Sequence, residues 1–162
     1  MNKFAALVKL LGEAQVDFVV IGGYAAMLHG SAFLTQDLDI CYERSPQNLR
    51  RLAAALAPIH PRLRGAPEGI PFSLDERTLA QGMNFTLQTD WIDLDLLGEI
   101  SGAGQFSDLV RDAESIDVYG APHLVASLDT IIKSKQAAGR PKDRNALPEL
   151  EALRELKFRK HK

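Results

Sequence analysis

The chain has 162 residues, of which 46% are hydrophobic and 25% are charged, and its formal net charge is −2 at pH 7. This length is enough for one globular domain with a sizeable core, and we expect no second full domain. The small negative charge excludes a general electrostatic attraction to nucleic acid, so any contact with RNA or DNA must come from a local basic patch.

The first predicted element is an amphipathic helix over residues 3–15. Its apolar residues recur at helical spacing and are interrupted by Lys9. A secretory signal would need an uninterrupted apolar region, and no run in the sequence is long enough to span a membrane. The single cysteine, Cys41, excludes an internal disulfide framework and is typical of a reducing compartment. We therefore expect a cytoplasmic protein with no membrane partner.

A strand over residues 17–22 and a helix over residues 23–29 come next, joined by two glycines. The run Phe18–Ile21 is apolar and rich in β-branched residues, as expected of a buried strand, and it stops at Gly22 and Gly23. A glycine turn that opens a helix leaves backbone N–H groups free to bind anionic oxygens, and it lets a phosphate approach without meeting a Cβ atom. The sequence therefore predicts a phosphate-binding turn at these glycines.

The following strand, over residues 36–42, carries two aspartates on one face. Residues two apart in a strand point the same way, so Asp37 and Asp39 share a face while the apolar residues that alternate with them enter the core. Their repulsion has to be relieved by raised pKa values, by basic partners or by a divalent cation. Mg²⁺ suits such a pair because it binds carboxylates together with substrate phosphates. Cys41 continues this face, either at the border of the site or as a small buried residue.

A helix and a proline-rich loop separate this strand from the next one. The helix begins at Pro46, after a serine cap, and ends at Pro58. The segment 58–71 contains four prolines and two glycines, which favours a loop or a set of turns. Arg62 and Arg64 in this loop are either solvated or substrate-facing, and exposed arginines are common enough to favour the solvated interpretation.

A β-hairpin that turns near Thr89 supplies further aspartates. Asp93 and Asp95 lie on one face of its second strand. Either of them can meet Asp37 and Asp39 if the two strands are neighbours in a sheet. The hairpin thus offers a third carboxylate for a metal site, and the alternation alone leaves both candidates open.

The C-terminal part of the chain contains the remaining predicted elements. These are a glycine-rich turn over 98–104, a helix over 106–113, a strand over 115–119, a helix from Ser127 to Ala138, and a last helical region that Pro148 breaks before residues 149–156. The helix that ends at Ala138 carries Lys133 and Lys135 on different faces, so at most one lysine points at the acidic site. The elements indicate a mixed α/β fold, with a single domain over residues 1–156 and a basic tail over residues 157–162. A frayed, solvated tail is the favoured interpretation, and weak contact with RNA is the alternative.

These motifs resemble the minimal nucleotidyltransferases of the DNA polymerase β type superfamily, most closely the small bacterial branch grouped with abortive-infection and toxin nucleotidyltransferases. The pattern of that superfamily is a glycine turn, a spacer, an Asp-x-Asp strand and a later acidic residue between hydrophobic ones. The chain has Gly22-Gly23, Asp37-Leu38-Asp39, and Asp95 within Asp95-Leu96-Leu97-Gly98. The resemblance extends through the segment from Leu128 to Asp143 and so covers most of the chain.

The resemblance implies an α+β fold with a small mixed β-sheet flanked by helices, a nucleotidyltransferase-like core and C-terminal helices. It implies that Asp37 and Asp39 bind two Mg²⁺ ions. Asp95, rather than its rival Asp93, would bind the ion that activates an acceptor hydroxyl. The other ion would hold a nucleoside triphosphate such as ATP, with its phosphates seated on the glycine turn.

The implied activity is transfer of a nucleoside monophosphate from the triphosphate to a hydroxyl of RNA or protein, with release of pyrophosphate. Lys133 or Lys135 would neutralise charge on the phosphates. The resemblance also suggests a toxin–antitoxin component with an antitoxin protein as partner. The chain departs from the family at Phe33, because related sequences often carry a basic residue just before the Thr-x-Asp segment.

Two alternatives to nucleotidyl transfer remain open at this point. Glycosyl transfer from a nucleotide sugar also uses an Asp-x-Asp metal site, although the chain is short for that class of enzyme. The other alternative is a catalytically inactive module of the same fold that binds a nucleotide or a partner protein. The presence of all three candidate carboxylates favours the transferase over the inactive module.

Overall fold

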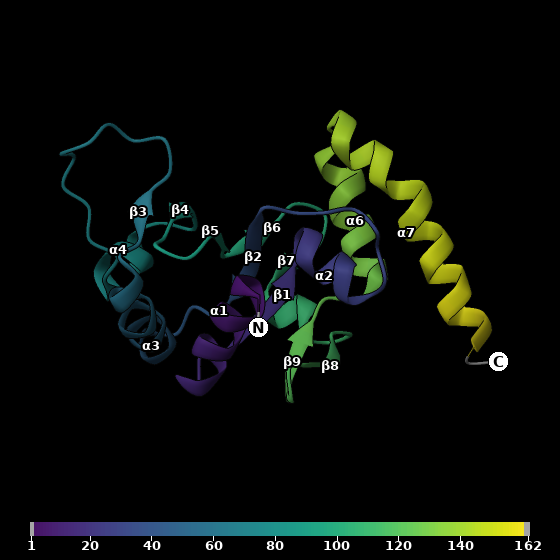
Figure 1. Cartoon of the computed structure of the whole chain (residues 1–162), viewed down its shortest axis with the longest axis horizontal. Helices are drawn as coiled ribbons and strands as arrows, with labels where there is room; N and C mark the ends of the chain where they lie inside the picture. The colour runs from purple at the N-terminus through teal and green to yellow at the C-terminus, as the bar shows by residue number, and fades with distance from the viewer. Residues whose placement is uncertain (1, 161–162) are drawn as a thin grey trace.

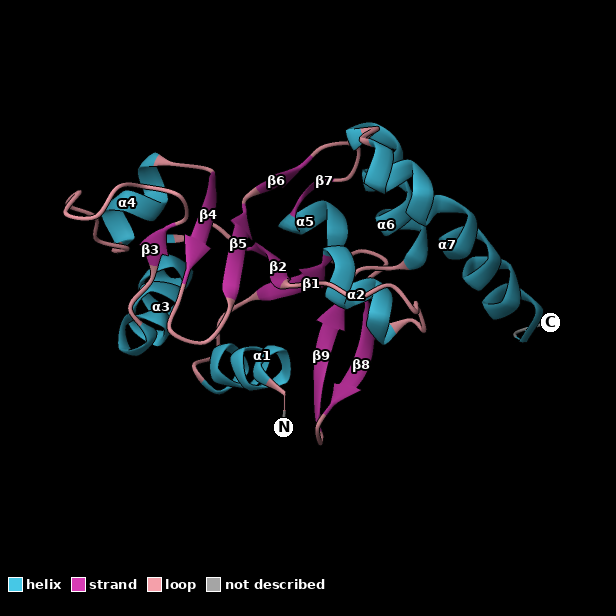
Figure 2. Ribbon diagram, turned by 45° about the horizontal axis from the view of Figure 1, so that its top comes forward, coloured by secondary structure: helices cyan, strands magenta, loops and turns pink. Residues whose placement is uncertain are grey.

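The computed structural model describes residues 2–160, and its strands form one large mixed sheet and one small hairpin. The strands are β1 (Phe18–Ile21), β2 (Asp37–Tyr42), β3 (Arg62–Leu63), β4 (Asn84–Gln88), β5 (Asp93–Leu97), β6 (Glu99–Ile100), β7 (Gly104–Gln105), β8 (Glu114–Val118) and β9 (Ala121–Val125). The large sheet has the order β3-β4-β5-β2-β1-β9-β8, and β6 pairs with β7 in the hairpin (Figure 2).

The helices flank this sheet and extend beyond both of its ends. They are α1 (Lys3–Glu13), α2 (Gly22–Leu28), α3 (Pro46–Leu56), the 3₁₀ turn η1 (Ala57–Ile59), α4 (Glu76–Gln81), α5 (Phe106–Leu109), α6 (Leu128–Ala138) and α7 (Pro141–Lys160). Figure 1 shows α3 and α4 at one end of the molecule and α6 and α7 at the other. The predicted fold class, a mixed sheet flanked by helices with C-terminal helices, is confirmed. Among the described residues, no helix has both the length and the apolar character that crossing a membrane requires.

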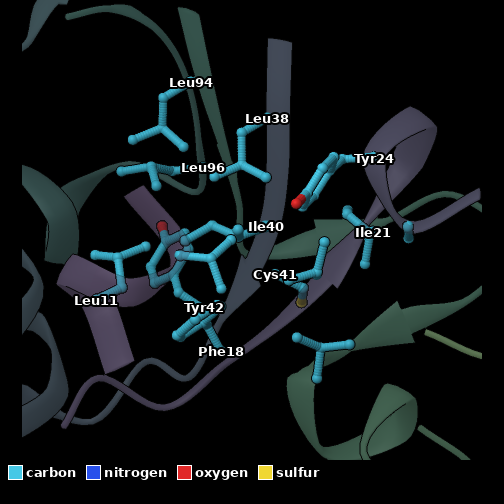
Figure 3. Close-up of a cluster of buried hydrophobic side chains, with 14 of the residues drawn as sticks. Leu11, Phe18, Ile21, Tyr24, Leu38, Ile40, Cys41, Tyr42, Leu94 and Leu96 are labelled. Carbon is cyan, nitrogen blue, oxygen red and sulfur yellow. The ribbon is translucent and has the colours of Figure 1, made fainter. Parts of the chain in front are cut away.

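The core covers both faces of the sheet, and one large part of it lies on the face opposite the aspartates. Leu38 and Ile40 of β2 are fully buried, as the alternation in this strand predicts. Figure 3 shows Leu11 of α1 close to Ile40 and Tyr42. Burial of each such side chain contributes about 2 kcal/mol to folding, so this face fixes which way the alternating aspartates point.

The order of the central strands decides which acidic residues are neighbours. β2 pairs antiparallel with β1 on one side and parallel with β5 on the other. In the parallel pair, Asp37 lies opposite Asp93 and Asp39 lies opposite Asp95. The condition that the two acidic strands are adjacent is therefore met.

Pro148 does not break the last helix, and that prediction was wrong. α7 is continuous from Pro141 to Lys160 with Pro148 in its interior. The helix packs along α6, and it buries Asp143 before the proline and Leu150 after it. Because tertiary contacts hold both halves in line, they outweigh the loss of one backbone hydrogen bond at the proline.

Other elements differ in extent from the prediction. The helix expected over 106–113 ends at Leu109, and Asp112 beyond it accepts hydrogen bonds from the hydroxyls of Ser127 and Thr130 at 2.8 and 3.3 Å. These hydrogen bonds connect the segment after α5 to the start of α6 and accompany the early end of α5. Within the predicted loop 58–71, Arg62 and Leu63 form β3, and the glycine-rich turn contains the β6–β7 hairpin. Strand β9 was not predicted.

The predicted basic tail begins inside α7. Residues 157–160 continue the helix, and residues 161–162 lie outside the described residues. Lys157 forms an ion pair with Glu114 of β8, so the first residue of the predicted tail is not merely solvated. The division of the chain into a domain over 1–156 and a tail over 157–162 stays a prediction.

Asn48 connects the start of α3 to the residues that flank β1 and β2. Its side chain is 2% exposed, and its Oδ1 atom accepts the N–H of Asp17 at 2.7 Å. Its Nδ2 atom donates to the carbonyls of Asp17 at 3.0 Å and Glu43 at 2.7 Å. Asn48 thus holds together the chain segments that align the β1–β2 pair.

We predict that Asn48→Ala lowers the free energy of unfolding by about 3 kcal/mol, because it leaves buried backbone groups without partners. Chemical denaturation measures the change. Gln47→Ala, at an exposed position of the same helix, is the control and should change stability by less than about 0.5 kcal/mol. Equal stabilities of the two variants would contradict this role of Asn48.

Candidate metal centre

Three aspartates from two strands converge at the centre of the acidic face. One carboxylate oxygen from each of Asp37, Asp39 and Asp95 lies within 4.8 Å of the other two. In residues 2–160, Asp93 is not part of this group, although it lies on the same face of β5. We call Asp37, Asp39 and Asp95 the aspartate triad. Its geometry favours Asp95 over Asp93 as the third carboxylate.

Asp39 is the most deeply placed member of the triad. Burial, followed by the negative charges of Asp95 and Asp37, raises its pKa to about 8. Burial also raises the pKa of Asp95, while a hydrogen bond with Asp39 and the charge of Arg64 oppose this shift. The Oδ1 atom of Asp39 is buried and has no hydrogen-bond partner. A buried carboxylate oxygen without a partner, among close carboxylates, fits a hard divalent cation.

The two glycines allow the chain to pass close to the triad. Gly22 has φ +66°, and a Cβ atom there would lie 2.1 Å from Oδ2 of Asp39. A Cβ atom on Gly23 would lie 2.7 Å from Cβ of Thr35. Larger residues at these positions would therefore displace Asp39 or the segment before β2. The role of the glycines in phosphate binding stays a prediction.

A pocket of about 270 Å³ opens directly on the triad. Gly23 lies at its border, and three cationic residues line its wall: Lys135 of α6, Arg140 between α6 and α7, and Lys142 of α7. Phe33 also lines the pocket and is 55% exposed. The loop that carries Phe33 is anchored to α7, because Glu149 accepts hydrogen bonds from the Ser31 hydroxyl and from the Ala32 N–H. The pocket thus has an acidic floor and a basic wall.

Asp143 holds two of these cations in place. It is completely buried, and it pairs with Nε of Arg140 at 2.7 Å and with Nζ of Lys135 at 3.4 Å. Burial disfavours its charge, but the hydrogen bonds from Arg140 and the charge of Lys135 lower its pKa overall. Lys133 is exposed and is not among the residues that line the pocket. Of the two predicted lysines, the structure brings only Lys135 to the triad.

Arg64 reaches the acidic face, so the interpretation of this residue as solvated was wrong. Its Nη2 atom lies 2.9 Å from Oδ1 of Asp95, and its Nε atom lies 3.2 Å from Oδ2 of Asp93. Arg62 is exposed and pairs with Asp90 instead. The sequence gives little sign of this difference, because only the two-residue strand β3 brings Arg64 to the sheet.

Cys41 does not border the site. It is fully buried and is not among the residues that line the pocket, and burial raises the pKa of its thiol to about 12. A thiol in this state is inert at neutral pH. Of the two interpretations drawn from the sequence, the small buried residue is confirmed.

No protein-family profile matches the chain, and no curated protein sequence matches it significantly. Solved structures do match. One is the crystal structure of a Thermotoga maritima protein provisionally assigned as a nucleotidyltransferase, with a TM-score of 0.58 over 89% of this chain and 87% of that one. The two sequences are 18% identical, so the similarity establishes the fold alone. The chain has a nucleotidyltransferase-like fold.

The raised pKa of Asp39 predicts how stability depends on pH in the metal-free protein. The unfolded chain releases this proton near the ordinary value of 3.8, whereas the folded protein retains it up to about pH 8. Stability therefore falls as pH rises between these values. Asp39→Asn removes this effect, and we predict that its stability advantage over the wild type grows by about 2 kcal/mol between pH 5 and pH 8.

Thermal or chemical denaturation at several pH values in a chelating buffer measures this advantage. Addition of Mg²⁺ at pH 8 should stabilise the wild type but not the variant. A difference between the two proteins that does not vary with pH would show that burial does not shift the Asp39 pKa.

Proposed function

We propose that this protein is a metal-dependent nucleotidyltransferase that moves a nucleoside monophosphate from a nucleoside triphosphate to an acceptor hydroxyl and releases pyrophosphate. The observation that carries the proposal is the convergence of Asp37, Asp39 and Asp95 within 4.8 Å on neighbouring strands. The fold similarity and the adjacent basic wall of the pocket support it.

The aspartate triad would hold the metal ions. Asp37 and Asp39 would contact two Mg²⁺ ions, and Asp95 would contact the one on the acceptor side. Bound there, the ions supply stabilisation for the attacking and leaving oxygens of an in-line displacement at the α-phosphorus. The buried Oδ1 atom of Asp39, which has no partner, is an available ligand atom.

The residues around the pocket suggest where the triphosphate binds. Gly22 and Gly23 would present backbone N–H groups to it, and Lys135 and Arg140 would neutralise its charge from the opposite wall. We assign no phosphate contact to Lys133, because its side chain lies outside the pocket lining. Phe33 stands where related sequences often carry a basic residue, so the cations of this pocket come from α6, α7 and their connection rather than from the loop that carries Phe33.

The acceptor and the biological setting rest on the sequence resemblance. We propose RNA or protein as the source of the acceptor hydroxyl, a reducing cytoplasmic location, and a toxin–antitoxin role with an antitoxin partner. The net charge of −2 favours an acceptor recognised locally over one recognised through extended electrostatic contact.

One observation favours a second candidate function, an inactive module of the same fold. Arg64 forms an ion pair with Asp95, and this pair satisfies part of the acidic cluster without any metal. Such a module would bind a nucleotide or a partner protein and transfer nothing. Tight triphosphate binding without transfer to any acceptor would identify it.

We predict that Asp37→Asn, Asp39→Asn and Asp95→Asn each lower transfer at least about 100-fold, because each removes a metal ligand. The assay incubates the protein with each labelled triphosphate, total RNA and cell protein, with and without Mg²⁺. Asp93→Asn is the matched control, since Asp93 shares a strand and face with Asp95 but lies outside the triad. It should retain activity within about tenfold of the wild type.

The pattern of losses separates the possible outcomes. Transfer that survives Asp37→Asn or Asp39→Asn would exclude the proposed site. Loss of transfer in Asp93→Asn but not in Asp95→Asn would assign the third carboxylate to Asp93. Sugar transfer from a nucleotide sugar, with no labelling from triphosphates, would favour the glycosyltransferase alternative.

A further inference from the structure

The guanidinium of Arg64 lies beside the carboxylates of the acidic face, although Arg64 is not among the residues that line the pocket. Its guanidinium lies 2.9 Å from Asp95, 3.2 Å from Asp93 and 4.0 Å from Asp37, measured between nitrogen and carboxylate oxygen. Two of these three carboxylates, Asp37 and Asp95, belong to the aspartate triad. The side chain approaches from the β3–β4 side of the sheet, whereas the cations of the pocket wall come from α6, α7 and the connection between them.

Arg64 is held in this position by the neighbouring strand. Its backbone N–H donates to the carbonyl of Thr86 at 3.0 Å, and its Nη2 atom donates to the carbonyl of Leu87 at 2.7 Å. The residue therefore makes directed contacts to β4 as well as to the carboxylates. This ordered geometry distinguishes it from an exposed arginine that happens to lie near acids.

The chain that follows Arg64 lies at the surface of the protein. Residues 65–70 are all exposed, and Gly65, which directly follows Arg64, has φ +77° and no atom within 4 Å of the position of a Cβ atom. Release of the guanidinium from the triad therefore requires no rearrangement of the core. It requires only that the side chain swings towards solvent at the end of β3.

We propose that Arg64 is an internal cation that competes with the divalent metal for the aspartate triad. In the metal-free protein it supplies part of the charge that the carboxylates need, and it leaves Asp37 and Asp95 when a metal ion binds. The protein therefore binds the metal ion more weakly than the same three carboxylates would bind it without Arg64. This inference depends on the metal site of the proposed function.

Arg64 and the metal ion compete because both interact with the carboxylate of Asp95. Asp95 is a member of the triad and also the carboxylate closest to Arg64. A divalent ion on the triad and a guanidinium on Asp95 would place three positive charges within a few ångströms in a half-buried site, where their repulsion is weakly screened. An arginine that oriented Asp95 for the metal would have the opposite effect and would strengthen metal binding. The two effects have opposite signs in a binding measurement.

We predict that Arg64→Gln binds Mn²⁺ about tenfold more tightly than the wild type. Isothermal titration calorimetry and the electron paramagnetic resonance signal of free Mn²⁺ both measure this affinity without reference to activity. Arg64→Lys retains the positive charge and should stay within about threefold of the wild type. Arg62→Gln is the matched control, because Arg62 lies two residues away and pairs with Asp90 instead of the triad. Its affinity should equal that of the wild type.

A second measurement uses the wild-type protein, so it does not depend on the folding of a variant. Phenylglyoxal modifies accessible arginines, and peptide mass mapping locates the products. We expect saturation with Mn²⁺ to increase modification of Arg64 several-fold and to leave Arg62 unchanged. In Asp39→Asn, which lacks a triad ligand, the same addition of Mn²⁺ should have no effect on Arg64.

The outcomes that overturn the proposal are distinct. Equal or weaker Mn²⁺ binding by Arg64→Gln would overturn it while leaving the metal site intact, and weaker binding would make Arg64 a positioning residue for Asp95. Unchanged or reduced phenylglyoxal modification of Arg64 in the Mn²⁺-saturated wild type would overturn displacement. No Mn²⁺ binding by the wild type or by Arg64→Gln would overturn both this inference and the proposed metal-dependent function.

Discussion

The parallel pairing of β2 with β5 is the constraint on which the site depends. It places Asp37 opposite Asp93 and Asp39 opposite Asp95, so four carboxylates share one face of two adjacent strands. The apolar side chains that alternate with them fill the core, and neither strand can turn over without burying its acids there. The energy of the core therefore enforces an arrangement of like charges that is unfavourable by itself.

The rest of the molecule supplies what that acidic face requires. Positive charge comes from two directions: Lys135 and Arg140 are aligned by the buried Asp143, and Arg64 reaches the face from β3. The close approach of α2 requires glycine at position 22, because any Cβ atom there would collide with Asp39. Burial, followed by the charges of Asp95 and Asp37, raises the pKa of Asp39, whose Oδ1 atom has no hydrogen-bond partner among the described residues. These features converge on a cation site.

Local sequence patterns predicted most of the elements that carry the candidate site. The strand that ends just before Gly22, the alternation around Asp37 and Asp39, and the cap of α6 at Ser127 all follow from periodicity and capping within a few residues. The errors arose where distant contacts override local rules. Pro148 stays inside α7 because α6 holds the helix on both sides of it, and the tie between Asp112 and α6 accompanies the early end of α5.

The sequence by itself predicted the candidate ligands, with Asp93 and Asp95 as rivals, and the face on which each lies, because strand alternation is a local property with a period of two residues. Only the tertiary structure decided which strands are neighbours, and therefore that Asp95 rather than Asp93 completes the triad. It also decided that Lys135 reaches the pocket, that Lys133 does not, and that Arg64, just after β3, contacts aspartates of β5 and β2. Tertiary packing decides which charged residues distant in sequence become neighbours, and the local pattern of apolar and polar residues does not show these contacts.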